Sequence, residues 1–416
     1  MSSKQASLPF ILITIFLDVL GIGLMIPVLP SVVGSMTHSH DAQSWWYGAL
    51  MVTYGLVQFF TVPLLGALSD RFGRRPVLLL STFGLGFSYT VTATTHSLVI
   101  LLLSRVVSGA TGASFTVASA YIADITTPEG RGRGFGIMGA AFGVGFIFGP
   151  AIGGVLGQYD LRLPFKVAAG MALLNWLYGF FVLPESLPVD RRSPVSLKRA
   201  NPLGALVHLS QLKGVGGLIA VYAFSILAQW VLQTTWVLYT TFRFNWNTRD
   251  NGIALFVVGL TSALVQGVLL GRLLKRFGEA RLALIGMSSA AIIYVAYGLV
   301  TAGWMLYCLI LLNFLSFAAT PALQAIISKA SDPRQQGLTQ GSLNSIQSVT
   351  TVAAPLIGTP LLAMVAHLPA HDWRVGITFF VSAGLEVVAL VLAFFHFRKL
   401  PAAPAVAPPA ADHGVS

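Results

Sequence analysis

Long apolar runs, separated by short polar turns, constrain this chain more than any other feature. A run of about 18 or more residues with few charges is typical of a helix that crosses a membrane. Hydrophobic residues make up 55% of the chain, and the mean hydropathy is +0.77. The roughly twelve runs lie near 8–33, 45–68, 76–94, 97–123, 135–157, 166–183, 214–241, 251–273, 280–300, 303–328, 337–365 and 373–397. We therefore predict an all-α membrane protein with twelve transmembrane helices.

The basic residues are distributed unequally between the two sets of alternating loops. With the N-terminus placed in the cytoplasm, 19 of the 25 Lys and Arg residues fall in cytoplasmic loops and five in the opposite loops, while Arg105 lies inside a predicted helix. This asymmetry follows the positive-inside rule of membrane proteins. We predict that both termini are cytoplasmic and that the net charge of +11 faces anionic lipid rather than nucleic acid.

An internal repeat divides the chain into two halves. The segment VPLLGALSDRFGRR (62–75) recurs as QGVLLGRLLKRFGEA (266–280), and the offset of 205 residues also relates Pro150 to Pro355. The predicted segments are an N-terminal six-helix bundle (1–183), a cytoplasmic linker (184–213), a C-terminal six-helix bundle (214–399) and a disordered tail (400–416). Parallel halves of this kind are a transporter architecture with the ligand site near the midplane between them.

The turn GALSDRFGRR (66–75) is unusually rich in charge, and its signs are reversed in the second half. Lys275 stands at the position of Asp70, and Glu279 at that of Arg74. A solvated basic turn with no further role is the alternative, but the reversed signs favour a gate to which each half contributes opposite charges. The predicted gate consists of Gly66, Asp70, Arg71, Gly73, Arg74, Asp124, Lys275, Glu279 and Lys329. Gly66 and Gly73 would let two helices and a tight turn approach closely.

Three ionisable side chains, those of Asp18, Arg105 and Glu386, lie within predicted helices. A charge at bilayer depth costs on the order of 2.5–3.5 kcal/mol, so each requires a reason. Because desolvation disfavours a carboxylate, Asp18 is suited to proton coupling or substrate contact, with a structural pairing to Arg105 or the backbone as the alternative. Glu386 is either a second carboxyl on the proton pathway or a lipid-facing side chain near a helix end.

The motif GALSDRFGRRP resembles the signature loop of the major facilitator superfamily, and the chain is similar within it to drug/proton antiporters, above all the tetracycline efflux proteins. The matching stretches are LDVLGIGLMIPVLP (17–30), SRVVSGATGA (104–113), GAAFGVGFIFGPAIGG (139–154), TTWVLYTTFRFNWN (234–247) and PALQAIISKASDPRQQG (321–337). The resemblance implies two pseudo-symmetric six-helix bundles with alternating access. It also implies a monomer in the bacterial cytoplasmic (inner) membrane, driven by the proton gradient, with no cofactor and no metal.

The resemblance also implies residue roles. The family uses its signature loop as a latch, which places Asp70 against the eleventh helix and Arg74 near Asp124. The R-x-x-x-G pattern from Arg105 to Gly109 is similar to the family's proton-linked motif. The pattern GFIFGPAIGG is similar to an antiporter motif that accompanies export, although ordinary packing of small residues is the alternative. That motif is carried by Gly145, Gly149, Pro150, Gly153 and Gly154.

Several polar side chains are expected to face a central cavity. Tyr54 and Gln58 are one helical turn apart, so they share a face, and they match a substrate-contacting pair of the tetracycline exporters, as does Gln266. Any single buried amide is equally explained by contacts between helices. The predicted substrate-binding set is Tyr54, Gln58, Gln229, Gln233, Trp236, Gln266, Asn313, Gln324 and Asn344. Such a set suits an amphiphilic organic compound.

Three positions differ from the tetracycline exporters, and these differences change the substrate that we expect. Ser88, Ser262 and Ala290 stand where tetracycline exporters carry an Asp, a His and an Asp. We therefore expect a proton-coupled exporter with a different or broader substrate and fewer protonatable groups. An uptake symporter for a small metabolite would share the fold, but the pattern at 135–157 disfavours it. Enzyme motifs such as HExxH, GxSxG and a Walker loop are absent from the sequence.

Overall fold

The computed structural model describes residues 3–127, 130–194, 216–330 and 336–399, and within these ranges it contains helices and turns but no strand. Eleven helical rods in this part are long and apolar enough to cross a membrane, and Ile11–Met25 is a shorter apolar helix. With that segment the twelve predicted runs each have a helix. The all-α membrane fold is confirmed for the described residues.

The crossings fall into two bundles of six, and the elements follow the chain without exchange between the halves. The N-terminal bundle contains α1 (Ser3–Met25), α3 (His40–Phe72), α4 (Arg74–Thr94), α5 (Leu98–Thr111) continued by α6 (Ser114–Ile125), α7 (Arg131–Tyr159) and α8 (Leu163–Val182). The C-terminal bundle contains α10 (Gly216–Phe244), α11 (Thr248–Leu264) continued by α12 (Leu270–Phe277), α13 (Glu279–Leu299), α14 (Gly303–Leu312) continued by α15 (Ala319–Ala330), α16 (Gln336–Val365) and α17 (Ile377–Lys399). The predicted tail and most of the predicted linker lie outside the described residues.

Several crossings are interrupted where the sequence predicts one continuous helix. The run at 8–33 is divided into α1 and the short α2 (Leu29–Gly34), because Pro27 disfavours the helical conformation of the residue before it and lacks an N–H group. The run at 97–123 is interrupted at Gly112, whose carbonyl oxygen accepts a hydrogen bond from Gln58 Nε2 at 3.1 Å. A π-helical turn at Val265–Leu269 separates α11 from α12. A 3₁₀ segment at Asn313–Ala318 separates α14 from α15.

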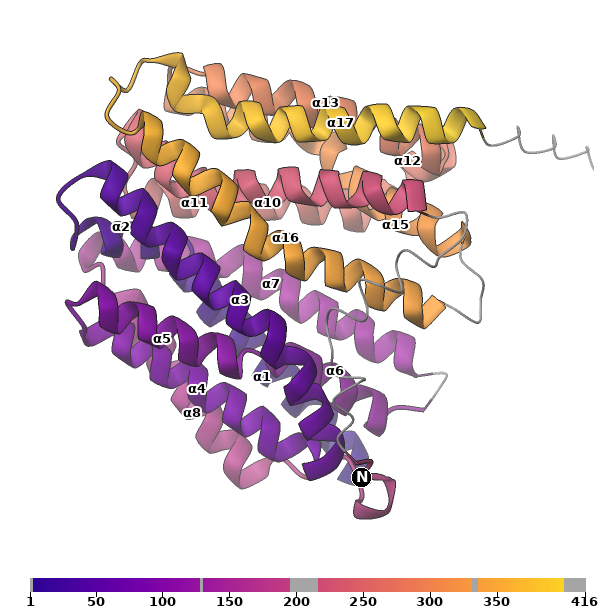
Figure 1. Ribbon diagram of the computed structural model, residues 1–416. Helices are drawn as coiled ribbons and strands as arrows, with labels where there is room; N and C mark the ends of the chain where they lie inside the picture. Colours follow the sequence, from indigo (N-terminus) through magenta and orange to yellow (C-terminus); the bar gives the residue numbers. More distant parts are fainter. Residues whose placement is uncertain (1–2, 128–129, 195–215, 331–335, 400–416) are drawn as a thin grey trace, which may run out of the picture.

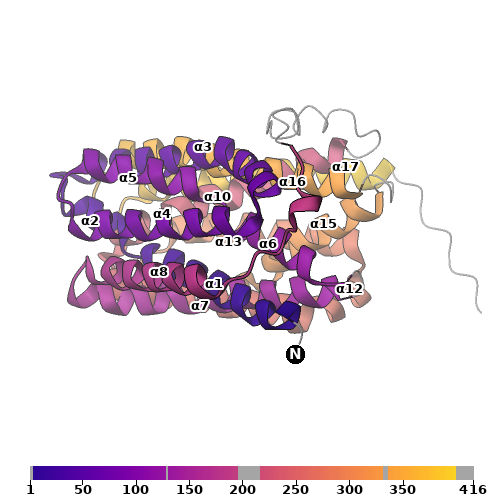
Figure 2. The same cartoon turned by 90° about the horizontal axis from the view of Figure 1, so that it is seen from below.

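All the crossings run between the same two ends of the molecule. One end, called here the basic end, holds the turns at Gly73 and Gly278, and α1 begins and α17 ends there (Figures 1 and 2). The other end, called the opposite end, holds α2 and the turn at Asp160. The two glycines have φ of 106° and 72°. Residues with a side chain adopt such positive φ values only with strain, whereas glycine adopts them readily. The prediction of a tight turn at Gly73 therefore has a local backbone cause.

The bundles contact each other near the opposite end, through α3 against α16 and α7 against α11. Thr248 Oγ1 donates a hydrogen bond to Gly154 O at 3.1 Å. The rings of Phe148 and Phe256 lie 5.7 Å apart. These contacts close the opposite end.

Toward the basic end the bundles separate. Figure 1 shows α3 and α16 side by side near α2 and apart at their other ends. A Cβ atom added at Gly66, Gly143 or Gly341 would meet nothing within 4 Å, and Asn344 and Ser348 on α16 are exposed. Polar side chains exposed on a membrane helix face water rather than lipid. The structure is therefore open at the basic end.

Candidate functional site

A small cavity, lined mostly by apolar side chains with a few polar ones, lies inside the N-terminal bundle. Its volume is about 100 Å³ and its lining includes Asp18, Tyr54, Gln58, Ser114 and Phe142, contributed by α1, α3, α6 and α7. Ligand pockets for drug-sized molecules measure about 300–1,000 Å³. The cavity therefore has room for a few waters or one group of a ligand rather than for a whole drug-sized molecule.

Asp18 lines this cavity, and one of its carboxyl oxygens forms no hydrogen bond. Asp18 is 7% exposed, Oδ1 accepts a hydrogen bond from Asn175 Nδ2 at 3.4 Å, and Oδ2 forms no hydrogen bond, although the Ser114 hydroxyl is close enough to interact with the carboxyl. Asn175 on α8 is fixed in turn by the hydroxyl of Thr14, which donates to Asn175 Oδ1 at 3.2 Å. A buried carboxylate without a cation is costly, and a proton or a ligand donor removes that cost. The site is therefore built to accept one of them.

Arg105 is held by neutral groups rather than by a carboxylate. Its side chain is 2% exposed, and Nη2 donates to Ser88 Oγ at 3.0 Å and to Thr92 Oγ1 at 3.1 Å. Nη1 lies 3.1 Å from Met25 Sδ. The structural pairing of Asp18 with Arg105, one of the alternatives from the sequence, is not present, because no carboxylate of the described residues is within 4 Å of the guanidinium. Ser88, one of the departures from the family, is therefore an uncharged partner of Arg105.

Tyr54 and Gln58 share one face of α3, as predicted, and contact each other. Gln58 Nε2 donates to Tyr54 Oη at 3.0 Å, in addition to its bond to Gly112 O. Both side chains line the cavity that contains Asp18. The break between α5 and α6 thus has a consequence for the site, since it presents a backbone carbonyl to Gln58.

The predicted substrate residues of the C-terminal bundle do not converge in the same way. Gln229 and Asn344 are exposed and Gln233 is half-buried. Gln266 donates to Ser262 Oγ at 2.8 Å, Gln324 donates to Tyr222 Oη at 3.3 Å, and Asn313 is buried. In this conformation, open at the basic end, these side chains face different surroundings. The N-terminal bundle supplies the described cavity.

The expectation that Trp236 lines a pocket differs from what the structure shows. Trp236 is 4% exposed, and its ring packs edge-on against Tyr297 at 5.4 Å and Phe379 at 6.1 Å. The aromatic contacts place it in the core of the C-terminal bundle, because its large apolar surface is better buried there than beside the amides of α10.

The glycines of α7 form two separate contacts. Gly145, Gly149 and Gly153 face α1, where a Cβ added at Gly149 would lie 2.6 Å from Gly23 Cα. Gly154 faces α11, together with Pro150, whose carbonyl oxygen would lie 2.6 Å from a Cβ at Gly252. Packing of small residues, the alternative reading, describes the first contact. The second contact joins the two bundles, so it is broken if the opposite end opens.

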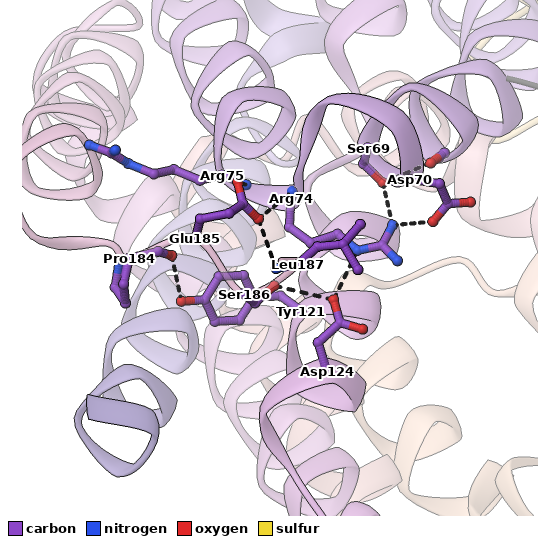
Figure 3. A network of polar contacts seen from close by, with 11 residues as sticks. Ser69, Asp70, Arg74, Arg75, Tyr121, Asp124, Pro184, Glu185, Ser186 and Leu187 are labelled. Atoms are coloured by element: carbon purple, nitrogen blue, oxygen red, sulfur yellow. Dashed lines mark hydrogen bonds and ion pairs between the residues drawn. The ribbon is translucent and has the colours of Figure 1, made fainter. Parts of the chain in front are cut away.

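The charged turn at the basic end is organised around Arg74 (Figure 3). Its guanidinium forms ion pairs with Asp70 at 2.5 Å and with Asp124 at 3.1 Å, and Nη1 also donates to Ser69 Oγ at 2.7 Å. The expected proximity of Arg74 and Asp124 is therefore present. Asp70 differs from the expectation, because its side chain pairs with Arg74 rather than with α16. Arg71 points to the surface and stacks on Phe72.

The segment that follows α8 completes this network, and the sequence analysis did not identify it. Glu185 Oε1 accepts from the backbone N–H of Arg74 at 2.8 Å and Oε2 from that of Arg75 at 3.2 Å. Ser186 Oγ donates to Asp124 Oδ2 at 3.2 Å, and the Tyr121 hydroxyl donates to Pro184 O at 2.8 Å. A carboxylate at the first N–H groups of α4 accepts hydrogen bonds from donors that have no partner within the helix. It also interacts favourably with the positive end of the helix dipole. The signal was a lone acid directly after an apolar run.

The corresponding charges of the C-terminal bundle also pair within their own bundle. Lys329 Nζ lies 2.6 Å from Glu279 Oε1, at the positions that correspond to Asp124 and Arg74. The expectation of opposite charges meeting between the halves is not what this conformation shows, because the basic end is open and each bundle satisfies its own ions. Lys275 has no ion pair within 4 Å among the described residues. Gly66 permits no close helix contact here, since its surroundings are empty.

Sequence and fold comparisons agree with this architecture. A model of the Major Facilitator Superfamily matches residues 11–355. The chain belongs to the major facilitator superfamily. Over 390 residues it is 42% identical to the class C tetracycline resistance protein of Escherichia coli, an alignment that covers 94% of this chain and 96% of that protein. The class E tetracycline resistance protein of Escherichia coli is 36% identical over 387 residues, with 92% and 94% covered.

Among solved structures of the superfamily, the human organic anion transporter MFSD10 (TETRAN) has a TM-score of 0.67 and 25% identity. That match covers 94% of this chain and 100% of the human chain. The resemblance to tetracycline efflux proteins is thereby confirmed, and the chain is a multi-pass membrane transporter by family. Among the described residues, no group of three His, Cys, Asp or Glu side chains could hold a metal ion.

Proposed function

We propose that the protein is a secondary transporter that exports an amphiphilic organic compound or drug in exchange for protons by alternating access. The observation that carries the proposal is the unpartnered Asp18 oxygen on a cavity of the N-terminal bundle. The proposal is also supported by the 42% identity between this chain and a tetracycline resistance protein. A carboxyl that must bind either a proton or a ligand donor links the two fluxes, because one displaces the other.

The geometry supports a cycle with two states. In the state described here, a compound from the basic end reaches the space between the bundles and the Asp18 carboxyl, while contacts such as Thr248 with Gly154 close the opposite end. Rocking of the bundles would break these contacts and bring the charges of the basic end together. Binding of a proton at Asp18 from the opposite side then releases the compound and allows the return.

The orientation and setting follow from the charge distribution. We assign the basic end, with both termini, to the cytoplasm, because basic residues gather in its turns. The protein would act as a monomer in the bacterial inner membrane. Its energy would come from the proton gradient without a cofactor.

The pocket chemistry favours an amphiphilic substrate but not one particular drug. The hydroxyl of Tyr54 and the amide of Gln58 offer hydrogen bonds beside the rings of Phe115 and Phe142, which suits a molecule with an apolar body and a few polar groups. Ser88, Ser262 and Ala290 remove three groups that serve a metal–drug complex in tetracycline exporters. We therefore include tetracycline among the candidate substrates and do not restrict the pocket to it.

Everted membrane vesicles test the direction of transport. Vesicles that carry the protein and are energised to be acidic inside should accumulate tetracycline or the cationic dye ethidium, and a protonophore should abolish the accumulation. Vesicles without the protein are the control. The alternative, a proton-coupled uptake symporter for a small metabolite, predicts accumulation only in right-side-out vesicles, and that result would contradict export.

A further inference from the structure

A second buried carboxyl lies in the C-terminal bundle, far along the chain from the cavity of Asp18. Glu386 is 2% exposed and lies in the middle of α17, so the lipid-facing alternative does not describe it. Ser225 Oγ on α10 donates to Glu386 Oε1 at 2.9 Å, while Oε2 has no partner. The carboxyl is therefore inside the bundle and half satisfied.

Among the described residues, no cation forms an ion pair with this carboxyl. Tyr294 on α13 is close enough to interact with it electrostatically, and α16 contains no titratable residue. On α10, Arg243 is engaged by Val300 O at 2.8 Å and Asp372 O at 2.7 Å. Within α17, the basic residues His396, Arg398 and Lys399 lie about three turns beyond Glu386. Arg374, before α17, is paired with Asp372 at 2.7 Å. A charged carboxylate here would be uncompensated, which protonation avoids.

Glu386 occupies the position in the C-terminal bundle that Asn175, the hydrogen-bond partner of Asp18, occupies in the N-terminal bundle. In the N-terminal bundle a hydroxyl of the first helix, Thr14, bonds to the sixth helix at Asn175. In the C-terminal bundle a hydroxyl of the first helix, Ser225, bonds to the sixth helix at Glu386. Both bonds span 161 residues. The two halves thus carry one buried carboxyl each at equivalent junctions, on the first helix in one half and on the sixth helix in the other.

A polar stripe on α10 connects this junction with the exterior of the bundle. Ser225, Gln229 and Gln233 follow one another at four-residue intervals, so they lie along one side of the helix. Ser225 is buried, Gln229 is exposed and Gln233 is half-buried. Hydroxyl and amide groups can relay or solvate a proton where alkyl side chains cannot.

We propose that Glu386 is a second proton-binding group of the transporter, with Ser225 as its hydrogen-bond partner and the Ser225–Gln233 side of α10 as its path to water. It binds a proton at the unpartnered oxygen and releases it to water when the bundles rearrange. The proposal rests on the proposed proton exchange and adds a C-terminal site to it.

Infrared difference titration of the purified, reconstituted protein tests this directly, because the band of a protonated carboxyl does not require a known substrate. Acidification should produce such a band in the wild type, and Glu386→Gln should remove one component while Asp18→Asn removes another. Ser225→Ala should shift the Glu386 component, because the hydrogen bond is lost while the carboxyl remains. Ser382→Ala, one turn away and bonded only to Thr378 O, is the matched control and should change nothing.

The outcomes separate the two proposals. A Glu386→Gln spectrum that superimposes on the wild type throughout the titration would overturn the Glu386 assignment, and so would a Ser225→Ala spectrum without a shift if Glu386→Gln does not fold. Wild-type vesicles that show the Glu386 component but no proton-driven accumulation of tetracycline or ethidium would instead contradict the proposed export.

Discussion

The sequence predicted that Asp18 is functionally important, but it did not predict the contacts of its carboxyl group. A lone acid in an apolar run identified it, because a charge at that depth is costly. Its partner was not predictable, since Asn175 is 157 residues away and a single amide in a helix has many possible roles. The structure supplies the partner, and it shows that the second carboxyl oxygen forms no hydrogen bond.

Replacing Asp18 with Asn tests its role at the level of one atom. Asp18→Asn keeps the size of the side chain but cannot exchange a proton, so we expect resistance and proton-driven transport to fall about tenfold or more. A drug-susceptibility panel in an efflux-deficient host measures this. Asp160→Asn, at an exposed ion pair with Lys166, is the control. Full resistance in Asp18→Asn would show that another group carries the proton.

Glu185 illustrates a positioning role that sequence reasoning missed. Its carboxylate caps α4 and thereby fixes the start of the helix that carries Arg74. Removing a helix cap costs about 1 kcal/mol. We expect Glu185→Ala to lower the thermal stability of the solubilised protein and to slow transport. Asp190→Ala, at an exposed acid in the same segment, is the comparison. Equal stability of the two variants would contradict the capping role.

At the scale of elements, the contact between α7 and α11 is the part of the fold that must open and close. A Cβ at position 252 would lie 2.6 Å from Pro150 O and 2.9 Å from Gly154 Cα. The sequence identified the glycines of α7 by their spacing. It did not show that they serve two different neighbours, because spacing within one helix carries no information about which helix lies opposite.

A large side chain at this contact should change the balance between states. Gly252→Leu cannot fit against Pro150, so we expect the opposite end to remain open more of the time and the transport rate to fall several-fold. Gly170→Leu on α8, an exposed position where an added Cβ also meets nothing within 4 Å, is the matched control. Labelling of a cysteine that replaces Thr359, which is buried where α16 meets Gly48 of α3, in a Cys308→Ser background, reports access from the opposite side. Equal labelling in the two variants would argue against the contact as a closure.

Helix breaks were the least predictable elements. Prolines explain the end of α1, but the interruption at Gly112 and the π-helical turn at Val265–Leu269 depend on contacts with other helices. Hydropathy reports only how far a segment stays apolar, so it merges α5 with α6 and α11 with α12. Those merged segments contain the carbonyl that binds Gln58, which is why the fine structure of the site needed the fold.

At the scale of the whole molecule, the internal repeat predicted two six-helix bundles. The structure adds the conformation in which they are found, which is open at the basic end. The reversed charges at Arg74 and Glu279 suggested one shared gate, yet each residue pairs within its own bundle. An open basic end explains the difference, because the charges of the two halves are then too far apart to meet. The sequence records which residues correspond but not the conformation in which they are found.

Electron paramagnetic resonance distances between labels across the basic end test this state. We expect cysteines replacing Arg133 on α7 and Arg272 on α12, in a Cys308→Ser background, to give a long distance in the resting protein. A shorter distance should gain population when the closed state is favoured, because the bundles rock as bodies. A matched pair at the opposite end should change in the reverse sense. A single invariant distance at both ends would contradict alternating access.

The most direct measurement of the central claim counts protons and substrate in the same vesicles. Proteoliposomes with a pH-sensitive dye inside are given tetracycline or ethidium, and the two fluxes are recorded together for the wild type and Asp18→Asn. If the protein exchanges the compound for protons, protons move in the direction opposite to the compound in the wild type. This proton movement is lost in Asp18→Asn. Compound and protons moving in the same direction, or compound moving without protons, would contradict it.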